Sequence, residues 1–348
     1  MIDNAQCVSA TVYLRVERQN ARETLGRLLA LGLLDKGKGI VRGPRWVDFP
    51  VLGRPPPEMG EVVEGDLEPS QGQVTPYERA VKGAHIPAGL ARLMPDKWER
   101  LGTVLVLRLP KKLQEHKKEV AGAYAVALGV DTVLQDISGS KGVLREPTTE
   151  LLLGERTETV HTENYVRYRF DAARIMFSSG NMAERIRMGK TVRPGETVVD
   201  MFAGIGYFTL QMAVHGMPKM VHACELNPLS FRYLKENIKL NKVGRIVNPL
   251  EGDCRIVAPE GVADRVVMGH FDSLDFIPKA LKVLKPGGGV LHVHCLCRKD
   301  QIPKEAWDKV RRRAENEGRV AELVHCEKVK SYRPRIWHIV LDVAVASN

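Results

Sequence analysis

The stretch that decides the fold is Val198-Val199-Asp200-Met201-Phe202-Ala203-Gly204-Ile205-Gly206, an apolar run that ends in an acid and a turn with two glycines. A second apolar run, Val221-His222-Ala223-Cys224, ends in Glu225. Two successive strands joined through a Gly-rich turn, with an acid ending the second strand, are typical of a doubly wound α/β domain that binds a nucleoside. The glycines let the backbone approach the ligand closely.

Glu225 is placed to accept hydrogen bonds from both hydroxyls of a ribose, as in S-adenosylmethionine or NAD. The turn is not Gly-x-Gly-x-x-Gly, and it opens with Asp200, whose carboxylate would repel a pyrophosphate but suits a sulfonium amino acid. We therefore predict S-adenosylmethionine as the co-substrate, in contact with Asp200, Phe202, Ala203 and Gly204. The alternative is a generic βαβ turn that binds no ligand.

A third acid, Asp253, follows the apolar end of the expected third strand. Its carboxylate could accept a hydrogen bond from the adenine amino group, while the backbone N–H of Cys254 faces the ring. An Asx-turn or a helix N-cap would explain the same residue without a ligand.

The composition favours a nucleic-acid partner. The chain has 348 residues, 44% of them hydrophobic, a formal charge of +10 and a pI near 9.3. Such a charge indicates a polyanionic partner, although a merely basic enzyme remains the alternative. Cys295 and Cys297 lack a second pair at zinc spacing, so we expect no metal and a reducing cytoplasm. Neither a membrane span nor a signal peptide is predicted.

Four segments are expected along the chain. They are a small α/β domain at 1–54, an acidic Pro/Gly linker at 55–75, an α+β middle domain at 76–190 and a Rossmann-like catalytic domain at 191–348. In the last domain, strands and helices alternate until two final strands at 320–328 and 336–345 follow each other. We expect this pair to be the antiparallel hairpin that closes a seven-stranded sheet of the methyltransferase type.

Further candidate residues lie outside the nucleoside motifs. Before the first strand, Ser178 and Arg185 could both reach a carboxylate, and arginine does so bidentately; a solvated arginine is the alternative. Met268-Gly269-His270 stands where N-methylases of nucleic acids often carry an Asn-Pro device. His292 and His294 share one face of the fifth strand, as a substrate-facing pair, as a base, or as hydrogen-bonded core residues.

The segment from Lys328 to His338 combines cations with aromatic residues before an apolar strand. This mixture suits phosphate contacts and base stacking. A charged hairpin with no partner is the alternative.

The chain resembles a family of tRNA-modifying enzymes. The motifs that carry the resemblance are Arg156-Thr157-Glu158-Thr159-Val160-His161, Asp200–Gly206, Glu225-Leu226-Asn227-Pro228, Glu236-Asn237-Ile238-Lys239-Leu240-Asn241 and Lys330-Ser331-Tyr332 with His338. Archaeal and eukaryotic methyltransferases of N1 of guanosine-37 share them with their paralogue in wybutosine synthesis. The resemblance covers residues 100–345.

Three departures from the methyltransferase pattern favour the paralogue. They are Phe177-Ser178-Ser179-Gly180-Asn181 in place of Phe-Ser-Pro-Arg, Met268-Gly269-His270 in place of Asn-Leu-Pro, and the His292-Val293-His294 element. The resemblance then implies transfer of the 3-amino-3-carboxypropyl group of S-adenosylmethionine to C7 of 4-demethylwyosine at position 37 of tRNA(Phe), with release of 5′-methylthioadenosine. It also implies cofactor contacts at Ser178, Arg185, Glu225, Asp253 and Cys254.

The same resemblance fixes what we expect of partners and of the base. Residues 10–53 are similar to the tRNA-elbow-binding domain of the methyltransferases, so we expect a monomer that contacts the anticodon region and the elbow of tRNA(Phe). His270, His292 and His294 are the candidates for the base that takes the proton from C7. The rival functions are a guanosine-37 N1-methyltransferase and a catalytically idle tRNA-binding protein.

Overall fold

The computed structural model describes residues 11–35, 37–65, 74–141 and 146–347. The chain divides into two compact units, Met1–Arg79 and Ala80–Asn348, each described by itself.

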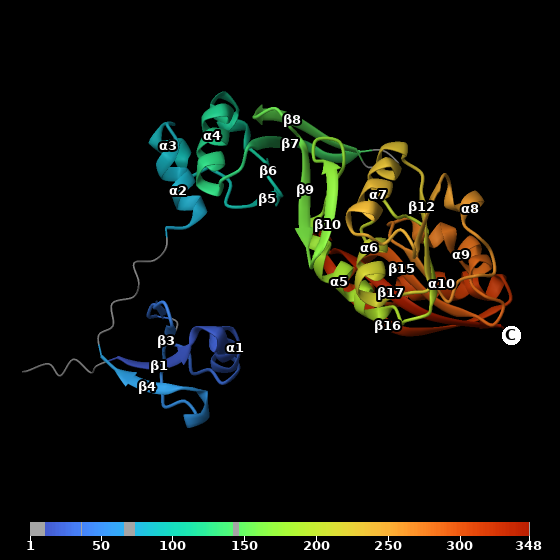
Figure 1. Cartoon of the computed structure of the whole chain (residues 1–348), viewed down its shortest axis with the longest axis horizontal. Helices are drawn as coiled ribbons and strands as arrows, with labels where there is room; N and C mark the ends of the chain where they lie inside the picture. The colour runs from blue at the N-terminus through green and yellow to red at the C-terminus, as the bar shows by residue number, and fades with distance from the viewer. Residues whose placement is uncertain (1–10, 36, 66–73, 142–145, 348) are drawn as a thin grey trace, which may run out of the picture. The chain divides into compact units, whose positions relative to one another are not determined.

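The first unit is a four-stranded antiparallel sheet with one helix (Figure 1). The strand order is β2 (Val41–Arg42), β3 (Trp46–Pro50), β1 (Val12–Glu17) and β4 (Glu61–Glu64), and the helix is α1 (Ala21–Ala30). Leu14 of β1, Leu28 of α1 and Phe49 of β3 are buried together in its core. These strands β1 to β3 and the helix α1 lie within the segment 1–54, for which the sequence predicts a small α/β domain.

The predicted linker at 55–75 is wrong for its first part. Pro57–Met59 forms a short 3-10 helix that buries Met59 in the core of the unit, and β4 pairs antiparallel with β1. The acidic composition misled the prediction because β4 is an edge strand whose Glu61 and Glu64 face solvent. Residues 66–73 of the predicted linker lie outside the described residues.

The second unit begins with a four-stranded sheet and its helices. The strand order is β5 (Trp98–Leu101), β6 (Val104–Leu107), β7 (Thr132–Lys141) and β8 (Glu146–Leu153). α2 (Pro76–Gly83) begins before the boundary at Ala80 and ends within this unit. The helices that follow are α3 (Ala88–Ala91) and α4 (Lys117–Leu128), the last preceded by a 3-10 helix at Lys111–His116.

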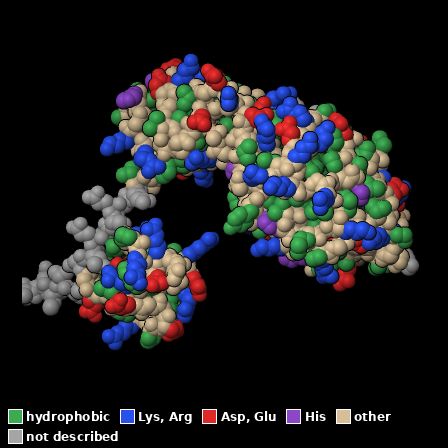
Figure 2. All heavy atoms as spheres, viewed as in Figure 1, with side chains coloured by type: hydrophobic (Ala, Val, Ile, Leu, Met, Phe, Trp, Pro, Cys, Tyr) green, Lys and Arg blue, Asp and Glu red, His purple; other side chains and the backbone are tan. Residues whose placement is uncertain are grey.

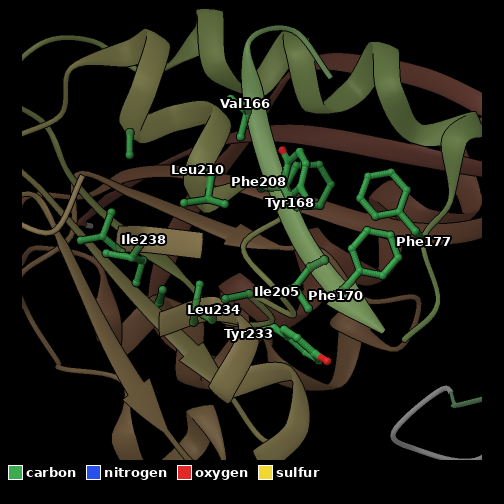
Figure 3. Close-up of a cluster of buried hydrophobic side chains, with 14 of the residues drawn as sticks. Val166, Tyr168, Phe170, Phe177, Ile205, Phe208, Leu210, Tyr233, Leu234 and Ile238 are labelled. Atoms are coloured by element: carbon green, nitrogen blue, oxygen red, sulfur yellow. The ribbon is translucent and has the colours of Figure 1, made fainter. Parts of the chain in front are cut away.

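The last strands of the predicted middle domain fall into two separate sheets. β8 belongs to the sheet just described, whereas β9 (Glu158–Glu163) and β10 (Val166–Asp171) form a separate hairpin. Tyr168 and Phe170 of β10 pack with Phe177 in the main core of the unit, where they meet residues of the catalytic domain (Figure 3). The hairpin therefore anchors the loop that leads from Phe177 into α5 (Met182–Thr191).

The catalytic domain is a seven-stranded sheet, as predicted. Its order is β13 (Val247–Glu251), β12 (Met220–Glu225), β11 (Thr197–Asp200), β14 (Arg265–Met268), β15 (Gly289–Arg298), β17 (Ile336–Ser347) and β16 (Arg319–Arg333). β11 to β15 are parallel to one another, and β17 lies antiparallel between β15 and β16. The later helices are α6 (Thr209–Gln211), α7 (Pro228–Leu240), α8 (Cys254–Val257), α9 (Ile277–Val283) and α10 (Lys304–Asn316).

None of the helices within the described residues is long and apolar enough to cross a membrane.

Candidate active site

A cavity of about 290 Å³ lies at the carboxyl ends of β11, β12, β13 and β14, which is where open α/β sheets bind their ligands. The loop between β10 and α5 supplies part of the remaining wall. The predicted cofactor residues that line it are Ser178, Arg185, Phe202, Gly204, Glu225, Asp253 and Cys254, together with the predicted catalytic residue His270.

Asp200 and Ala203 lie beneath the cavity rather than on its wall. Both are fully buried, and the Asp200 carboxylate accepts hydrogen bonds from the Thr209 hydroxyl at 2.7 Å and from the Phe202 N–H at 3.2 Å. Burial raises the pKa of Asp200 to about 6. The acid that ends β11 therefore shapes the glycine turn from below, which differs from the cofactor contact that we predicted for it.

The glycine turn has no room for side chains. Gly204 has a φ of +58°, and a Cβ there would lie 2.5 Å from the ring of Tyr207. A Cβ on Gly206, at a φ of +100°, would lie 2.7 Å from Leu210. The turn thus keeps a bare backbone on the cavity wall, as the sequence predicts.

Glu225, at the end of β12, ties the glycine turn to the start of α7. One carboxylate oxygen accepts a hydrogen bond from the Gly204 N–H at 2.7 Å, and the other accepts one from the Asn227 N–H at 2.7 Å. Burial raises the pKa of this carboxyl, and the backbone donors oppose the effect. A carboxylate has about four acceptor positions, so two remain for a pair of vicinal hydroxyls.

Asp253 is a helix N-cap, which was the alternative to ligand binding, and it also lines the cavity. Its side chain caps α8 by accepting from the Arg255 N–H at 2.9 Å, and it pairs with the Arg255 guanidinium. Hydrogen bonds from Arg255 lower the pKa of Asp253. Cys254 begins α8 beside it, and burial raises the pKa of its thiol to about 12, so the thiol is neutral.

Arg185 of α5 is already held by a carboxylate from the hairpin. Its guanidinium is buried, donates to both oxygens of Glu163 at 2.6 to 2.9 Å and lies over the Phe177 ring at 4.8 Å. It also donates to the backbone carbonyl of Ser178 at 2.9 Å. Arg185 thus positions the loop that carries Ser178.

Two residues that sequence reasoning missed contact Ser178 at this end of the cavity. Lys330 of β16 donates from its Nζ to the Ser178 hydroxyl at 2.6 Å, across 152 residues of sequence. Asn181 lines the cavity, and its Oδ1 is buried without a hydrogen-bond partner in the described part of the chain. Since an unsatisfied buried acceptor is costly, Asn181 Oδ1 is suited to a donor on a ligand. The sequence signal that could have identified Asn181 as a site residue is its position close to Ser178 in the same loop.

His270 reaches the cavity from the loop after β14. Its ring stacks on Phe202 with a centroid distance of 5.4 Å, and its Nδ1 accepts from the Asp272 N–H at 3.2 Å. The Asp272 carboxylate lies 3.6 Å from the same nitrogen, so a proton on Nδ1 would pair with that carboxylate and leave Nε2 as an acceptor.

His292 and His294 lie in the core of the sheet, outside the cavity wall. His292 accepts from Arg265 at 2.6 Å and lies 2.6 Å from the Asp342 carboxylate, while His294 lies 3.0 Å from the His338 ring. Burial lowers the pKa of both imidazoles. Of the three interpretations that the sequence left open, this geometry matches that of hydrogen-bonded core residues.

The arrangement is suited to a nucleoside with a charged tail. It offers a carboxylate for a diol at Glu225, a further carboxylate and a backbone N–H at Asp253 and Cys254, and polar groups at Ser178 and Asn181. Among the described residues, His, Cys, Asp and Glu side chains form no group of three or more that could hold a metal ion.

Comparisons with known proteins agree with this picture. Residues 159–323 match the TRM5/TYW2 methyltransferase domain, and residues 78–157 match the TYW2 N-terminal domain. The tRNA(Phe) (4-demethylwyosine(37)-C(7)) aminocarboxypropyltransferase of Pyrococcus horikoshii is 41% identical over 273 residues, which are 78% of this chain and 97% of that protein.

Solved structures extend the likeness. The structure of P. horikoshii TYW2 in complex with MeSAdo matches with a TM-score of 0.70 and 40% identity, over 78% of this chain and 98% of that chain. The structure of Trm5b from Pyrococcus abyssi matches with a TM-score of 0.70 and 30% identity, over 97% of this chain and 99% of that chain. The match to Trm5b thus spans more of this chain, and the match to TYW2 is closer in sequence.

Proposed function

The chain belongs to the TRM5/TYW2 family, and we propose that it transfers the 3-amino-3-carboxypropyl group of S-adenosylmethionine to C7 of 4-demethylwyosine at position 37 of tRNA(Phe). The observation that carries the proposal is 41% identity to an aminocarboxypropyltransferase over 97% of that protein's length. Met268-Gly269-His270 supports it, since a reaction at a ring carbon needs no Asn-Pro clamp for a target N–H.

The cavity residues receive roles within this proposal. Glu225 accepts from the two ribose hydroxyls, while Asp253 and the Cys254 N–H hold the adenine. Ser178, Asn181 and Arg185 surround the amino-acid end. The Arg185 charge is shared with Glu163, so the α-carboxylate would join an existing buried pair rather than meet an isolated cation.

The chemistry depends on which carbon of the sulfonium faces the acceptor. A sulfonium activates its methyl carbon, the ribose C5′ and the methionine Cγ, and in-line approach selects one of them. Attack by C7 on Cγ forms a carbon–carbon bond and breaks the Cγ–S bond. The electron pair remains on sulfur, and 5′-methylthioadenosine leaves. C7 then loses its proton, for which His270 is the one predicted base that lines the cavity.

Two labelled forms of S-adenosylmethionine test the reaction. One carries carbon-14 in the methyl group and the other carries it in the carboxyl group. We expect carboxyl label, and no methyl label, to enter precursor tRNA(Phe), and 5′-methylthioadenosine to accumulate. Methyl label in the tRNA would establish the guanosine-37 N1-methyltransferase instead, and no label with intact tRNA binding would establish an idle tRNA-binding protein.

The first unit has a separate proposed role in binding the tRNA elbow. The match to Trm5b covers 97% of this chain, whereas the two family domains begin only at residue 78. Lys and Arg side chains are spread over the surfaces of both units (Figure 2), so binding should weaken steeply with salt.

Deletion of residues 1–73 tests the role of this unit. A chain starting at Val74 keeps Thr75, whose hydroxyl and N–H pair with Glu78 at the start of α2. A cut after residue 54 would instead leave β4 in the truncated chain but remove β1, the strand with which it pairs. We expect weaker binding of full-length tRNA and unchanged binding of S-adenosylmethionine. Equal tRNA affinity in the truncated and full chains would refute the elbow role.

A further inference from the structure

An aromatic cluster stands on the outer side of the catalytic domain. The Tyr332 side chain, on β16, is 49% exposed. Its ring makes a T-shaped contact with the Phe271 ring at a centroid distance of 5.1 Å, and Phe271 makes a T-shaped contact with the His338 ring at 5.0 Å. The Tyr332 ring is thus held by an aromatic contact within the protein, while 49% of the residue is open to solvent.

The cluster adjoins the two loops that line the cavity. Phe271 stands between His270 and Asp272, both of which line it, although Phe271 itself is outside the wall. On the other loop, Lys330 holds the Ser178 hydroxyl at 2.6 Å. The end of β16 therefore contacts both loops at the mouth of the cavity, one through Lys330 and the other through Tyr332.

The chain around Tyr332 is strongly basic. Residues 328–335 contain Lys328, Lys330, Arg333 and Arg335 and no acid. Lys328, Arg333 and Arg335 are exposed, and none of them takes part in an ion pair within the described residues. A supported aromatic ring framed by solvent-exposed cations is the combination by which proteins bind single-stranded nucleic acid, through stacked bases and neutralised phosphates.

We propose that Tyr332 stacks on a nucleobase of the anticodon loop next to the acceptor nucleotide, while Lys328, Arg333 and Arg335 contact the adjoining phosphates. The proposal rests on the proposed function, which brings a single tRNA base into the cavity beside His270. A neighbouring nucleotide must then lie against the rim, where Tyr332 stands. The acceptor base itself is a poorer occupant because Tyr332 and Phe271 do not line the cavity.

The test measures tRNA binding in the absence of S-adenosylmethionine, so that it does not depend on the reaction. Tyr332→Ala in the full chain should weaken tRNA binding about five- to 150-fold, the range for loss of one stacked base. Tyr332→Phe and Tyr332→Trp should bind within about threefold of the parent, since each keeps a ring for stacking. Tyr165→Ala, which removes an exposed tyrosine from the β9–β10 turn, is the matched control and should leave binding unchanged.

A double-mutant cycle then identifies the base. Transcripts that carry a single abasic nucleotide on either side of position 37 are bound to the parent and to Tyr332→Ala. If Tyr332 stacks on a flanking base, removing that base weakens binding to the parent and has little further effect in Tyr332→Ala. Additive losses at both flanking positions, or a Tyr332→Phe variant as weak as Tyr332→Ala, would overturn the proposal. Methyl transfer in the labelling experiment would overturn the proposed function and leave this binding result standing.

Discussion

Substitution of Glu225 gives the most direct test of the cavity as a nucleoside site. In Glu225→Gln, one carboxylate oxygen is replaced by an NH₂ group. Both oxygens now accept from backbone donors, the Gly204 N–H and the Asn227 N–H, each at 2.7 Å. Glutamine can satisfy only one of these donors with its single oxygen, and its NH₂ opposes the other. Glu225→Ala removes both acceptors.

The expected loss follows from the hydrogen bonds concerned. Leaving a buried donor or a bound ribose hydroxyl without an acceptor costs about 1–3 kcal/mol. Binding of 5′-methylthioadenosine should therefore weaken about five- to 150-fold in Glu225→Gln, and at least as much in Glu225→Ala. Glu251→Gln is the matched control, because Glu251 is opposite Glu225 in the register of β12 and β13 but is exposed.

Calorimetry with the 2′-deoxy and 3′-deoxy analogues separates the ribose contact from loosening of the turn. The parent should discriminate against both analogues, and Glu225→Ala should bind them nearly as well as it binds the parent ligand. If Glu225→Ala keeps the full discrimination of the parent protein, Glu225 is not the residue that binds the diol.

Two further changes probe the support beneath and beside the cavity. Glu163→Gln leaves the buried Arg185 guanidinium without its counter-charge, which should lower the free energy of unfolding by about 3–5 kcal/mol in urea titrations. The double variant Glu163→Leu/Arg185→Met should recover most of that stability. A Glu163→Gln variant as stable as the parent would contradict the buried pair. For Asp200, the folded-state pKa of about 6 exceeds the ordinary 3.8, so the folded protein holds more protons between these values and loses stability as the pH rises through them. The free energy of unfolding of Asp200→Asn relative to the parent should rise by about 2.4 kcal/mol from pH 4 to pH 7, and a flat difference would refute the raised pKa.

Much of the site was predictable because its determinants are local in sequence. The strand, turn and acid around Gly204 and Glu225 follow from a pattern that spans one βαβ unit, and the structure places both residues in one cavity. Asp200 was assigned to the wrong side of the turn, because the sequence shows that an acid ends β11 but not that Thr209 and the Phe202 N–H take up its carboxylate.

The residues that sequence reasoning missed depend on distant pairings. Lys330 meets Ser178 only because β16 folds back onto the edge of the sheet. His292 and His294 were correctly expected to share one face of a strand, but periodicity cannot tell whether that face meets solvent or β17 and its Asp342. The strand β4 was not predicted, because its two valines stand between glutamates in an acidic, proline-rich stretch whose composition is typical of a linker.

The position of β17 constrains the order in which the protein can assemble during synthesis. β15 pairs with β17, from Gly289 opposite Val345 to Arg298 opposite Ile336, so one edge of β15 stays open while α10 and β16 emerge from the ribosome. In the native order β17 lies between β15 and β16, so β16 cannot pair with this edge of β15 in the native sheet. Nascent chains halted before residue 336 should therefore expose an unpaired apolar strand and attract chaperones, and those released after residue 347 should not.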